Sequence, residues 1–151
     1  MDIVLQNIPL VSAFSGFIAA QLLKIIVILV FERKLNLRVA TSTGGMPSSH
    51  TATVVALATS IGLIHGVGST LFAITLVFSI VVIYDAVGIR QAAGKHAELL
   101  NEMAQLISEI YEHGFKHKDL KTLLGHTYPQ VLAGILTGFA AGFIVTQQLF
   151  G

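Results

Sequence analysis

The stretch from Ser69 to Ile89 reads STLFAITLVFSIVVIYDAVGI, and Asp85 is its only charged residue. A helix of about 20 apolar residues crosses the hydrocarbon core of a bilayer, so this stretch predicts a membrane-spanning helix. Three other runs along the chain have a similar length and apolar character. They cover Ile8–Phe31, about Pro47–Ile64 and Gln130–Phe150.

The composition agrees with a membrane location. The chain has 151 residues, of which 54% are hydrophobic and 11% are charged, and its mean hydropathy is +0.78. Soluble domains carry roughly 25% charged residues, so this sequence could not cover a water-facing surface. We therefore expect an all-α integral membrane helical bundle with about four transmembrane helices, forming a single domain over residues 1–151. The first run lacks the basic leader and cleavage site of a signal peptide.

The absence of cysteine and the near-equal numbers of basic and acidic residues exclude several classes of function. The chain has no cysteine, which excludes disulfides, thiolate metal sites and thiol catalysis. Nine Lys and Arg residues face eight Asp and Glu residues, so no excess of positive charge favours nucleic acid as a partner. Membrane lipids are the partners that this composition predicts.

The basic residues predict an orientation. Both loops that follow odd-numbered runs are basic, whereas the turn at His65–Ser69 has no Lys or Arg. The positive-inside rule therefore makes the side with both basic loops cytoplasmic and leaves both termini outside, in the cytoplasmic (inner) membrane. The eight residues concerned are Arg33, Lys34, Arg38, Arg90, Lys95, Lys116, Lys118 and Lys121.

Two segments carry packing signals. Apolar residues recur at helical spacing over Ala97–Tyr111, which predicts a cytoplasmic amphipathic helix that packs on the bundle or lies in the membrane interface. Gly134, Gly138 and Gly142 recur every four residues and predict a groove along one helix face. We expect this groove to serve close packing within the bundle. The alternative is a face that joins two copies in a homo-oligomer.

The segment STGGMPSSHT at residues 42–51 is the most informative polar stretch. Pro47 suits the first position of a helix. The helix that follows would begin with free N–H groups at Ser48, Ser49 and His50. Such a helix start attracts anions, because unpaired N–H donors and the helix dipole act together. A plain serine cap is the alternative interpretation.

Other polar residues at membrane depth point to the same side of the membrane. They are Lys24, Asp85, Arg90 and His126, and together with His50 they come from four different runs. Two cations, a helix start and two histidines would suit a phosphate-like anion, with nucleophilic and acid–base roles divided between the histidines. A metal site at His50, His126 and Asp85 is ranked lower, because the cations would repel a metal. Lys24 alone could instead extend toward the membrane surface.

At these residues the sequence resembles the divergent, short branch of the type-2 phosphatidic acid phosphatase superfamily, which is related to vanadium haloperoxidases. The resemblance covers nearly the whole chain. Its carriers are GGMPSSH ending at His50, YDAVGIR ending at Arg90, and LGHT at His126 followed by QVLAG ending at Gly134. The motif Pro-Ser-Ser-His is similar to the superfamily motif Pro-Ser-Gly-His.

The resemblance implies a lipid phosphate or pyrophosphate phosphatase that needs no metal or other cofactor. It implies His126 as the nucleophile that forms a phosphohistidine and His50 as the general acid. The superfamily has an Asp four residues after the nucleophile, where this chain has Gln130, so Asp85 is a candidate for that orienting role. The usual Arg-to-His spacing is six residues, whereas Arg90 and His126 are 36 apart. The candidate phosphate-binding residues are Lys24, Arg90, Ser48, Ser49 and Gly45.

Two other functions are consistent with the sequence. A non-catalytic protein could bind or transport a lipid phosphate at the same anion site, and Gln130 and the long spacing favour this alternative. A structural membrane subunit would use the glycine face and the amphipathic helix instead.

Overall fold

The computed structural model describes residues 5–32, 45–110, 119–122 and 124–151. Its helices are α2 (Ile8–Glu32), α3 (Ser49–His65), α4 (Thr70–Val87), α5 (Ile89–Ile110) and α6 (Tyr128–Phe150). The described ranges contain no strand, so the prediction of an all-α membrane bundle is confirmed. The basic residues Arg33, Lys34, Arg38, Lys116 and Lys118 lie outside the described residues.

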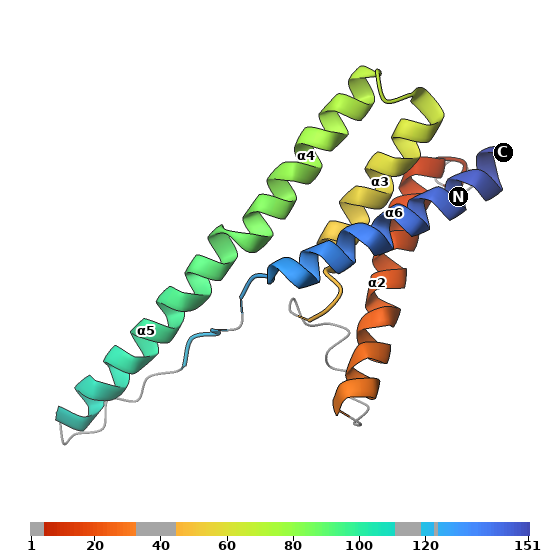
Figure 1. Ribbon diagram of the computed structural model, residues 1–151. Coiled ribbons are helices and arrows are strands. Elements are labelled where there is room, and N and C mark those ends of the chain that lie inside the picture. Colours follow the sequence, from red (N-terminus) through yellow and green to blue (C-terminus); the bar gives the residue numbers. More distant parts are fainter. Residues whose placement is uncertain (1–4, 33–44, 111–118, 123) are drawn as a thin grey trace.

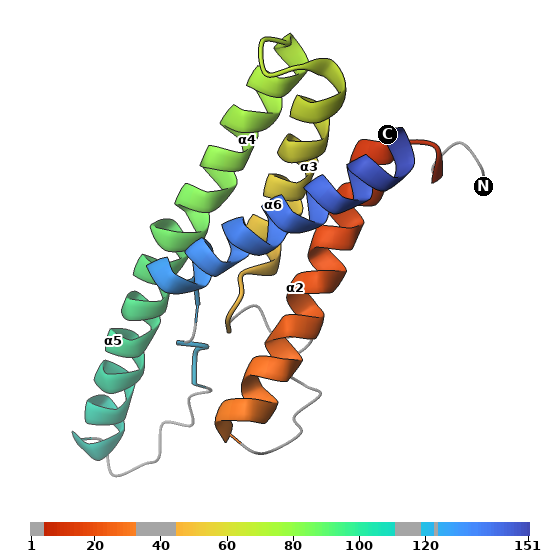
Figure 2. The ribbon, with the colours of Figure 1, turned by 45° about the vertical axis from the view of Figure 1, so that its right-hand side comes forward.

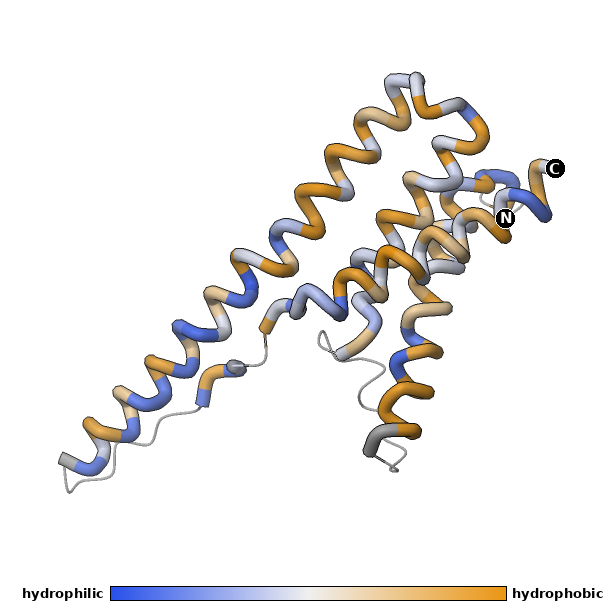
Figure 3. Tube along the Cα trace, viewed as in Figure 1, coloured by the Kyte–Doolittle hydropathy of each residue, from blue (hydrophilic) through white to orange (hydrophobic). Residues whose placement is uncertain are grey.

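Three described helical stretches have the length and composition to cross a membrane: Ile8–Val30, Thr70–Glu109 and Tyr128–Phe150. The second is the long bent helix formed by α4 and α5; hydrophobic residues predominate along α4, whereas hydrophilic and hydrophobic residues alternate along α5 (Figure 3). The fourth expected span is α3, which has 17 residues. Such a helix rises roughly 25 Å, near the lower limit for a span.

The helix α3 lies at the centre of the bundle. It packs against α2, α4 and α6, whereas α4 and α6 have little contact with each other. The turn between α3 and α4 lies at one end of the bundle, at the top of Figures 1 and 2, and the C-terminus lies toward the same end. The end of α2, the start of α3 and the start of α6 lie toward the other end.

The distribution of apolar side chains by size is the reverse of that in a soluble protein, with small residues in the core and large ones on the outer faces. The core consists of small residues such as Ala20, Ala52 and Ala56, which are fully buried. Large apolar side chains, including Phe14, Phe78 and Leu136, are exposed on the outer faces. Hydrocarbon solvates such side chains as well as a protein core does, so the driving force for association is close backbone packing rather than burial of large residues.

The three-glycine face of α6 packs on α3 and is not free for a second copy. A Cβ atom added at Gly134, Gly138 or Gly142 would lie 2.7, 2.4 or 2.6 Å from a carbonyl oxygen of α3. All three glycines are buried. This confirms the expected use of the groove in packing within the bundle and places the backbones of the two helices in direct contact.

Hydroxyl groups join three helices near the end of the bundle opposite to the start of α3. Thr146 of α6 donates a hydrogen bond of 2.8 Å to Ser60 of α3, and its oxygen lies 3.3 Å from the Ser12 hydroxyl of α2. All three side chains are buried. Each hydroxyl therefore has a polar partner, as groups at membrane depth require.

The helix α5 differs from the expected amphipathic helix in its start and its packing. It begins at Ile89 rather than Ala97, because Gly88 keeps a helical conformation (φ −92°, ψ −79°) and the chain continues from α4. The periodic apolar signal begins only near residue 97, so it missed the first two turns. Among the described helices α5 contacts only α4, and Figure 1 shows it extending away from the bundle. Of the two expected arrangements, packing on the bundle is therefore wrong for the described helices, and a position in the membrane interface stays a prediction.

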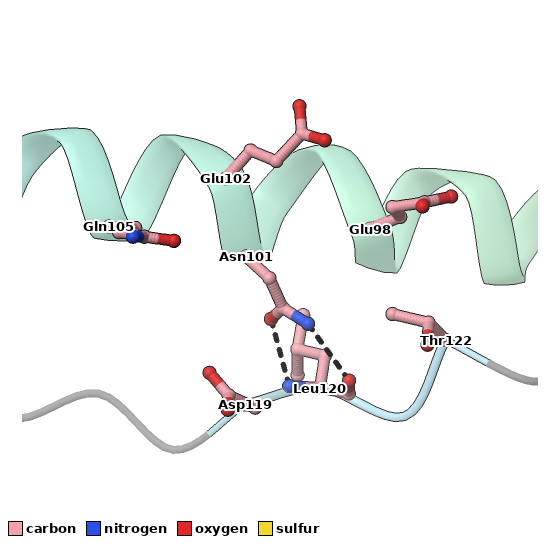
Figure 4. A pocket seen from close by; sticks show the side chains of 7 residues that line it. All are labelled: Glu98, Asn101, Glu102, Gln105, Asp119, Leu120 and Thr122. Atoms are coloured by element: carbon pink, nitrogen blue, oxygen red, sulfur yellow. Dashed lines mark hydrogen bonds between the residues drawn. The ribbon is translucent and has the colours of Figure 1, made fainter.

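The segment 119–122 runs beside α5 and is tied to it by one side chain. The Asn101 amide accepts a hydrogen bond from the Leu120 N–H (2.9 Å) and donates one to the Leu120 carbonyl (3.0 Å), as Figure 4 shows. A hollow of about 530 Å³ lies between α5 and this segment, with Glu98, Glu102 and Asp119 on its lining. The segment leads the chain back toward the start of α6.

The glycine contacts generate a stability prediction. We expect Gly138→Ala to lower the free energy of unfolding by about 1–3 kcal/mol, because the new methyl group would overlap the Ala52 carbonyl. Thermal unfolding of the detergent-solubilised protein measures the effect. Gly68→Ala is the matched control, since an added Cβ there meets nothing within 4 Å. Equal stability of the two variants would contradict the close packing of α3 on α6.

Candidate functional site

Two histidines from different helix starts face each other. The His50 ring, at the start of α3, and the His126 ring, just before α6, have centroids 6.3 Å apart and planes inclined by 56°. At this separation the ring nitrogens are beyond direct hydrogen-bond distance. The two rings therefore lie close together without a direct hydrogen bond between them.

The backbone before α6 fixes the position of His126. Gly125 has a φ of +83°, and a Cβ atom there would lie 2.6 Å from the Gln91 backbone nitrogen, so only glycine fits. The next residue, His126, donates its backbone N–H to the Ala86 carbonyl at 2.9 Å. This bond attaches the loop to the end of α4. As a result the His126 side chain is 4% exposed.

Gln130 determines which nitrogen of His126 carries the proton. Its Oε1 atom accepts a hydrogen bond from the Thr127 backbone N–H at 3.1 Å, which fixes the orientation of the amide. The same oxygen lies 3.2 Å from His126 Nδ1. A carbonyl oxygen can only accept, so Nδ1 must be the donor in neutral His126. The lone pair is then on Nε2, which is the form that a nucleophile requires.

Gln130 also connects the two helix starts. Its backbone carbonyl accepts a hydrogen bond from the Ser48 N–H at 3.0 Å, and Ser48 is the N-cap of α3. The residue was noted in the sequence only as a departure from the family pattern. Its two roles depend on contacts with Thr127 and Ser48, which the spacing of residues in the sequence does not reveal. Its position four residues after His126 was the one feature of the sequence that could have indicated a contact with that ring.

The surroundings of His126 favour its neutral form. Burial lowers the pKa of the imidazole below its ordinary value of 6.5, and the hydrogen bond with Gln130 opposes this effect. The charges of His50, Lys24 and Arg90 lower the pKa further. Three groups predicted from separate runs therefore act electrostatically on the same ring. Neutral His126 predominates above this lowered pKa.

The start of α3 is capped differently from the sequence-based expectation. Pro47 was expected at the first helical position, but the helix begins at Ser49 and Pro47 precedes the cap. The reason is that the Ser48 side chain accepts a hydrogen bond from the Thr51 N–H, which makes Ser48 the N-cap. The Ser48 N–H, expected to be free, donates to Gln130. Helix geometry leaves the N–H groups of Ser49 and His50 without a partner inside α3.

Lys24 is enclosed within the bundle. Its residue has no exposed surface, so the interpretation in which it extends outward to the membrane surface is wrong. The stem lies against Gly45, where an added Cβ would be 3.3 Å from Lys24 Cδ. Gly45 has a φ of +94°, so the backbone that covers the lysine stem also requires glycine. Gly44, beside it, lies outside the described residues.

Asp85 and Arg90 form an ion pair at the junction of α4 and α5. Arg90 Nε lies 2.6 Å from Asp85 Oδ2, and both side chains are partly exposed. Gln130 rather than Asp85 contacts the His126 ring, so the orienting role considered for Asp85 falls to Gln130 in this arrangement. Asp85 instead holds the guanidinium whose charge acts on His126.

The residues present favour an anion over a metal ion. No group of three His, Asp or Glu side chains within the described ranges is arranged to hold a metal, so His50, His126 and Asp85 do not make a ligand set. Lys24 and Arg90 add positive charge beside the two rings. With the helix start at Ser49, the site can bind an oxyanion and present a neutral imidazole nitrogen to it.

A membrane bundle in which these motifs meet defines a relative of the type-2 phosphatidic acid phosphatases. The chain belongs to the divergent PAP2 family, whose sequence model matches residues 5–141. The resemblance found in the motifs is thereby confirmed, and it places the chain in a phosphatase-related superfamily.

Comparison with individual proteins agrees with this assignment. The chain is 40% identical over 143 residues to the uncharacterized membrane protein YuiD of Bacillus subtilis (strain 168), and the match covers 89% of this chain and 90% of that protein. The chain is thus similar over nearly its whole length to another membrane protein. No solved structure matches it.

The Gln130 contacts generate a prediction that needs no enzymatic assay. We expect the pKa of His126 to fall in Gln130→Leu, because the hydrogen bond that raises it is lost. In Gln130→Glu the pKa should rise above that of the wild type, since a carboxylate stabilises the imidazolium. Titration by ¹⁵N NMR of histidine-labelled protein in nanodiscs measures both shifts, with His126→Ala to assign the signal.

The same spectra report the tautomer. Wild-type His126 should show a protonated Nδ1 and an unprotonated Nε2 at high pH, whereas Gln130→Leu should show a mixture. An unchanged tautomer ratio and pKa in both variants would contradict the role assigned to Gln130.

Proposed function

We propose that the protein is a membrane-embedded, metal-independent phosphatase that acts on a lipid phosphate or pyrophosphate. The observation that carries the proposal is the pair of facing rings, His50 and His126, in a cationic site at two helix starts. The catalytic candidates are His126, His50 and Asp85. The phosphate-binding candidates are Lys24, Arg90, Ser48, Ser49 and Gly45.

In the first step, His126 Nε2 attacks the phosphorus atom. The N–P bond forms as the P–O bond to the lipid breaks, and protonated His50 gives its proton to the departing oxygen. The products are a phosphohistidine and either a lipid alcohol, from a lipid phosphate, or a lipid monophosphate, from a lipid pyrophosphate. Arg90 and Lys24 offset the charge on the phosphoryl oxygens, as positively charged groups do in phosphoryl transfer.

In the second step, a water molecule attacks the phosphohistidine. His50, now neutral, accepts a proton from the water as the new P–O bond forms and the N–P bond breaks. This releases inorganic phosphate and regenerates both histidines. Asp85 contributes by holding Arg90, with which it forms a 2.6 Å ion pair.

A binding or transport function is the second candidate, and Gln130 is the observation that favours it. A neutral amide fixes the tautomer of His126 but does not stabilise the imidazolium that appears during catalysis, as a carboxylate would. A protein that only binds a lipid phosphate needs the cations and helix starts but not that stabilisation. It would bind phospholipids saturably without releasing phosphate.

Phosphate release from a panel of lipid phosphates and pyrophosphates tests the catalytic proposal. We expect the purified protein to release phosphate in the presence of EDTA, and His126→Ala to lose this activity entirely. His50→Ala should lower kcat by about 10²–10⁴-fold, the range typical for loss of a general acid. His65→Ala is the matched control, because His65 lies at the opposite end of α3.

The covalent intermediate provides an independent readout. Rapid denaturation after mixing with ³²P-labelled substrate should trap an acid-labile, base-stable phosphoprotein in the wild type and none in His126→Ala. Saturable lipid binding by the folded wild type with no release on the panel would favour the transport alternative. Full activity in both histidine variants would refute the assigned roles.

We also propose that the protein lies in the cytoplasmic (inner) membrane and that its site faces the cytoplasm. The support is the concentration of Lys and Arg in the loops on that side. Because the chain lacks cysteine, single-cysteine variants can report orientation directly. We expect Lys121→Cys to react with a membrane-impermeant maleimide only after cell lysis and Val67→Cys to react in intact cells. The reverse pattern would place the site outside.

A further inference from the structure

An apolar groove lies between α4 and α6, with α3 as its floor. It has a volume of about 450 Å³ and exists because both helices pack on α3 but diverge from each other. Its walls include Phe72 and Leu76 of α4 and Phe139 and Phe143 of α6. The end of the groove farther from the histidines reaches the turn between α3 and α4, where Val67 lines it.

The polar atoms in the groove are already satisfied. The Thr59 hydroxyl donates a hydrogen bond to the Val55 carbonyl, and the Ser79 hydroxyl donates one to the Thr75 carbonyl, each at 2.8 Å. The remaining lining is almost entirely carbon. An occupant therefore gains van der Waals contact but no hydrogen bond, which suits a hydrocarbon chain.

The length of the groove matches one leaflet. Phe72 and Ile83 both line it and are 11 positions apart on α4, which corresponds to roughly 16 Å of helix. The hydrocarbon core of a bilayer is about 30 Å thick, so this is about the depth that one lipid tail occupies.

One end of the groove lies near the histidine site along each of the three helices, although neither histidine lines it. Ile83 is one turn before Ala86, whose carbonyl accepts the His126 backbone N–H. Val55 of the groove is five residues after His50, and Ile135 is five residues after Gln130. Each of the three walls therefore leads within about a turn and a half to a residue that forms or holds the site.

From this proximity we propose that the groove between α3, α4 and α6 binds one hydrocarbon chain of a lipid phosphate whose head group lies between His50 and His126. The proposal rests on the proposed function for its head-group site. It predicts a preference for amphiphiles with at least one chain long enough to pass Ile83 and reach Leu76 over short-chain phosphates. Any second chain lies outside the groove, in the bilayer.

Matched substitutions on α4 test the groove through kinetics. Leu76→Trp would fill it, whereas Ile74→Trp changes a similarly large, exposed residue that does not line it. We expect Leu76→Trp to lower kcat/KM for a long-chain lipid phosphate at least tenfold and to leave propyl phosphate hydrolysis unchanged. Ile74→Trp should match the wild type on both substrates. Equal effects of the two variants, or equal loss on both substrates, would overturn the proposal.

A binding readout separates this proposal from the catalytic one. His126→Ala in nanodiscs is exposed to a long-chain alkyl phosphate carrying a mid-chain diazirine, irradiated and mapped by mass spectrometry. We expect labels at groove residues such as Leu76 and Phe139. These labels should be absent from the double variant that combines His126→Ala with Leu76→Trp. Labels confined to other faces would refute the groove even if phosphate is released. Labels in the groove without any release by the wild type would support it while the catalytic function fails.

A second copy is the competing occupant. In the cysteine-free chain, oxidation of Leu76→Cys in membrane vesicles would join two copies if they met at the groove. We expect Leu76→Cys to form no more disulfide-linked dimer than Ile74→Cys forms. Efficient dimer formation by Leu76→Cys alone would overturn the proposal in favour of an interface between copies.

Discussion

The direct contact between the backbones of α3 and α6 is the constraint on which the rest of the structure depends. Gly134, Gly138 and Gly142 leave no room for side chains between these helices. At the site end, this contact brings the start of α3 against the start of α6, so that the Ser48 N–H reaches the Gln130 carbonyl. The facing of His50 and His126 follows from the same contact, because each ring lies at one of the two helix starts. A wider separation of the helices would separate the rings as well.

The two ends of the bundle use polar groups for different purposes. At one end, the hydroxyls of Ser12, Ser60 and Thr146 bond to one another and hold three helices together. At the other end, Lys24, Arg90 and the histidines act on one another through charge, and Gln130 fixes the proton on His126. Small residues between the two ends allow close packing without large side chains. The hydroxyl cluster and the cationic site thus lie at opposite ends of the bundle.

The long apolar runs were sufficient to predict α2, α4 and α6, because a membrane-spanning helix is specified by length and composition alone. The glycine spacing likewise predicted close packing within the bundle. The start of α5 could not be predicted, since residues 89–96 form a helix by continuing α4 and show no apolar period of their own. The motifs identified the candidate residues of the site. They could not show that Gln130 rather than Asp85 orients the His126 ring, because this depends on which acceptor lies beside His126 in three dimensions. The burial of Lys24 depends in the same way on the backbone at Gly45 covering its stem.

The order of the site residues along the chain has a consequence for biosynthesis. Lys24 is in α2, His50 is in α3, Arg90 comes just after the end of α4, and His126 comes just before α6. Because a chain is made from its N-terminus, a nascent protein lacking α6 has the cations but neither the His126 imidazole nor the glycine face that holds α3 in place. The complete site therefore forms only after α6 has been inserted. A product that ends before residue 126 has no facing histidine pair, so the segment that carries His126 and α6 completes the site.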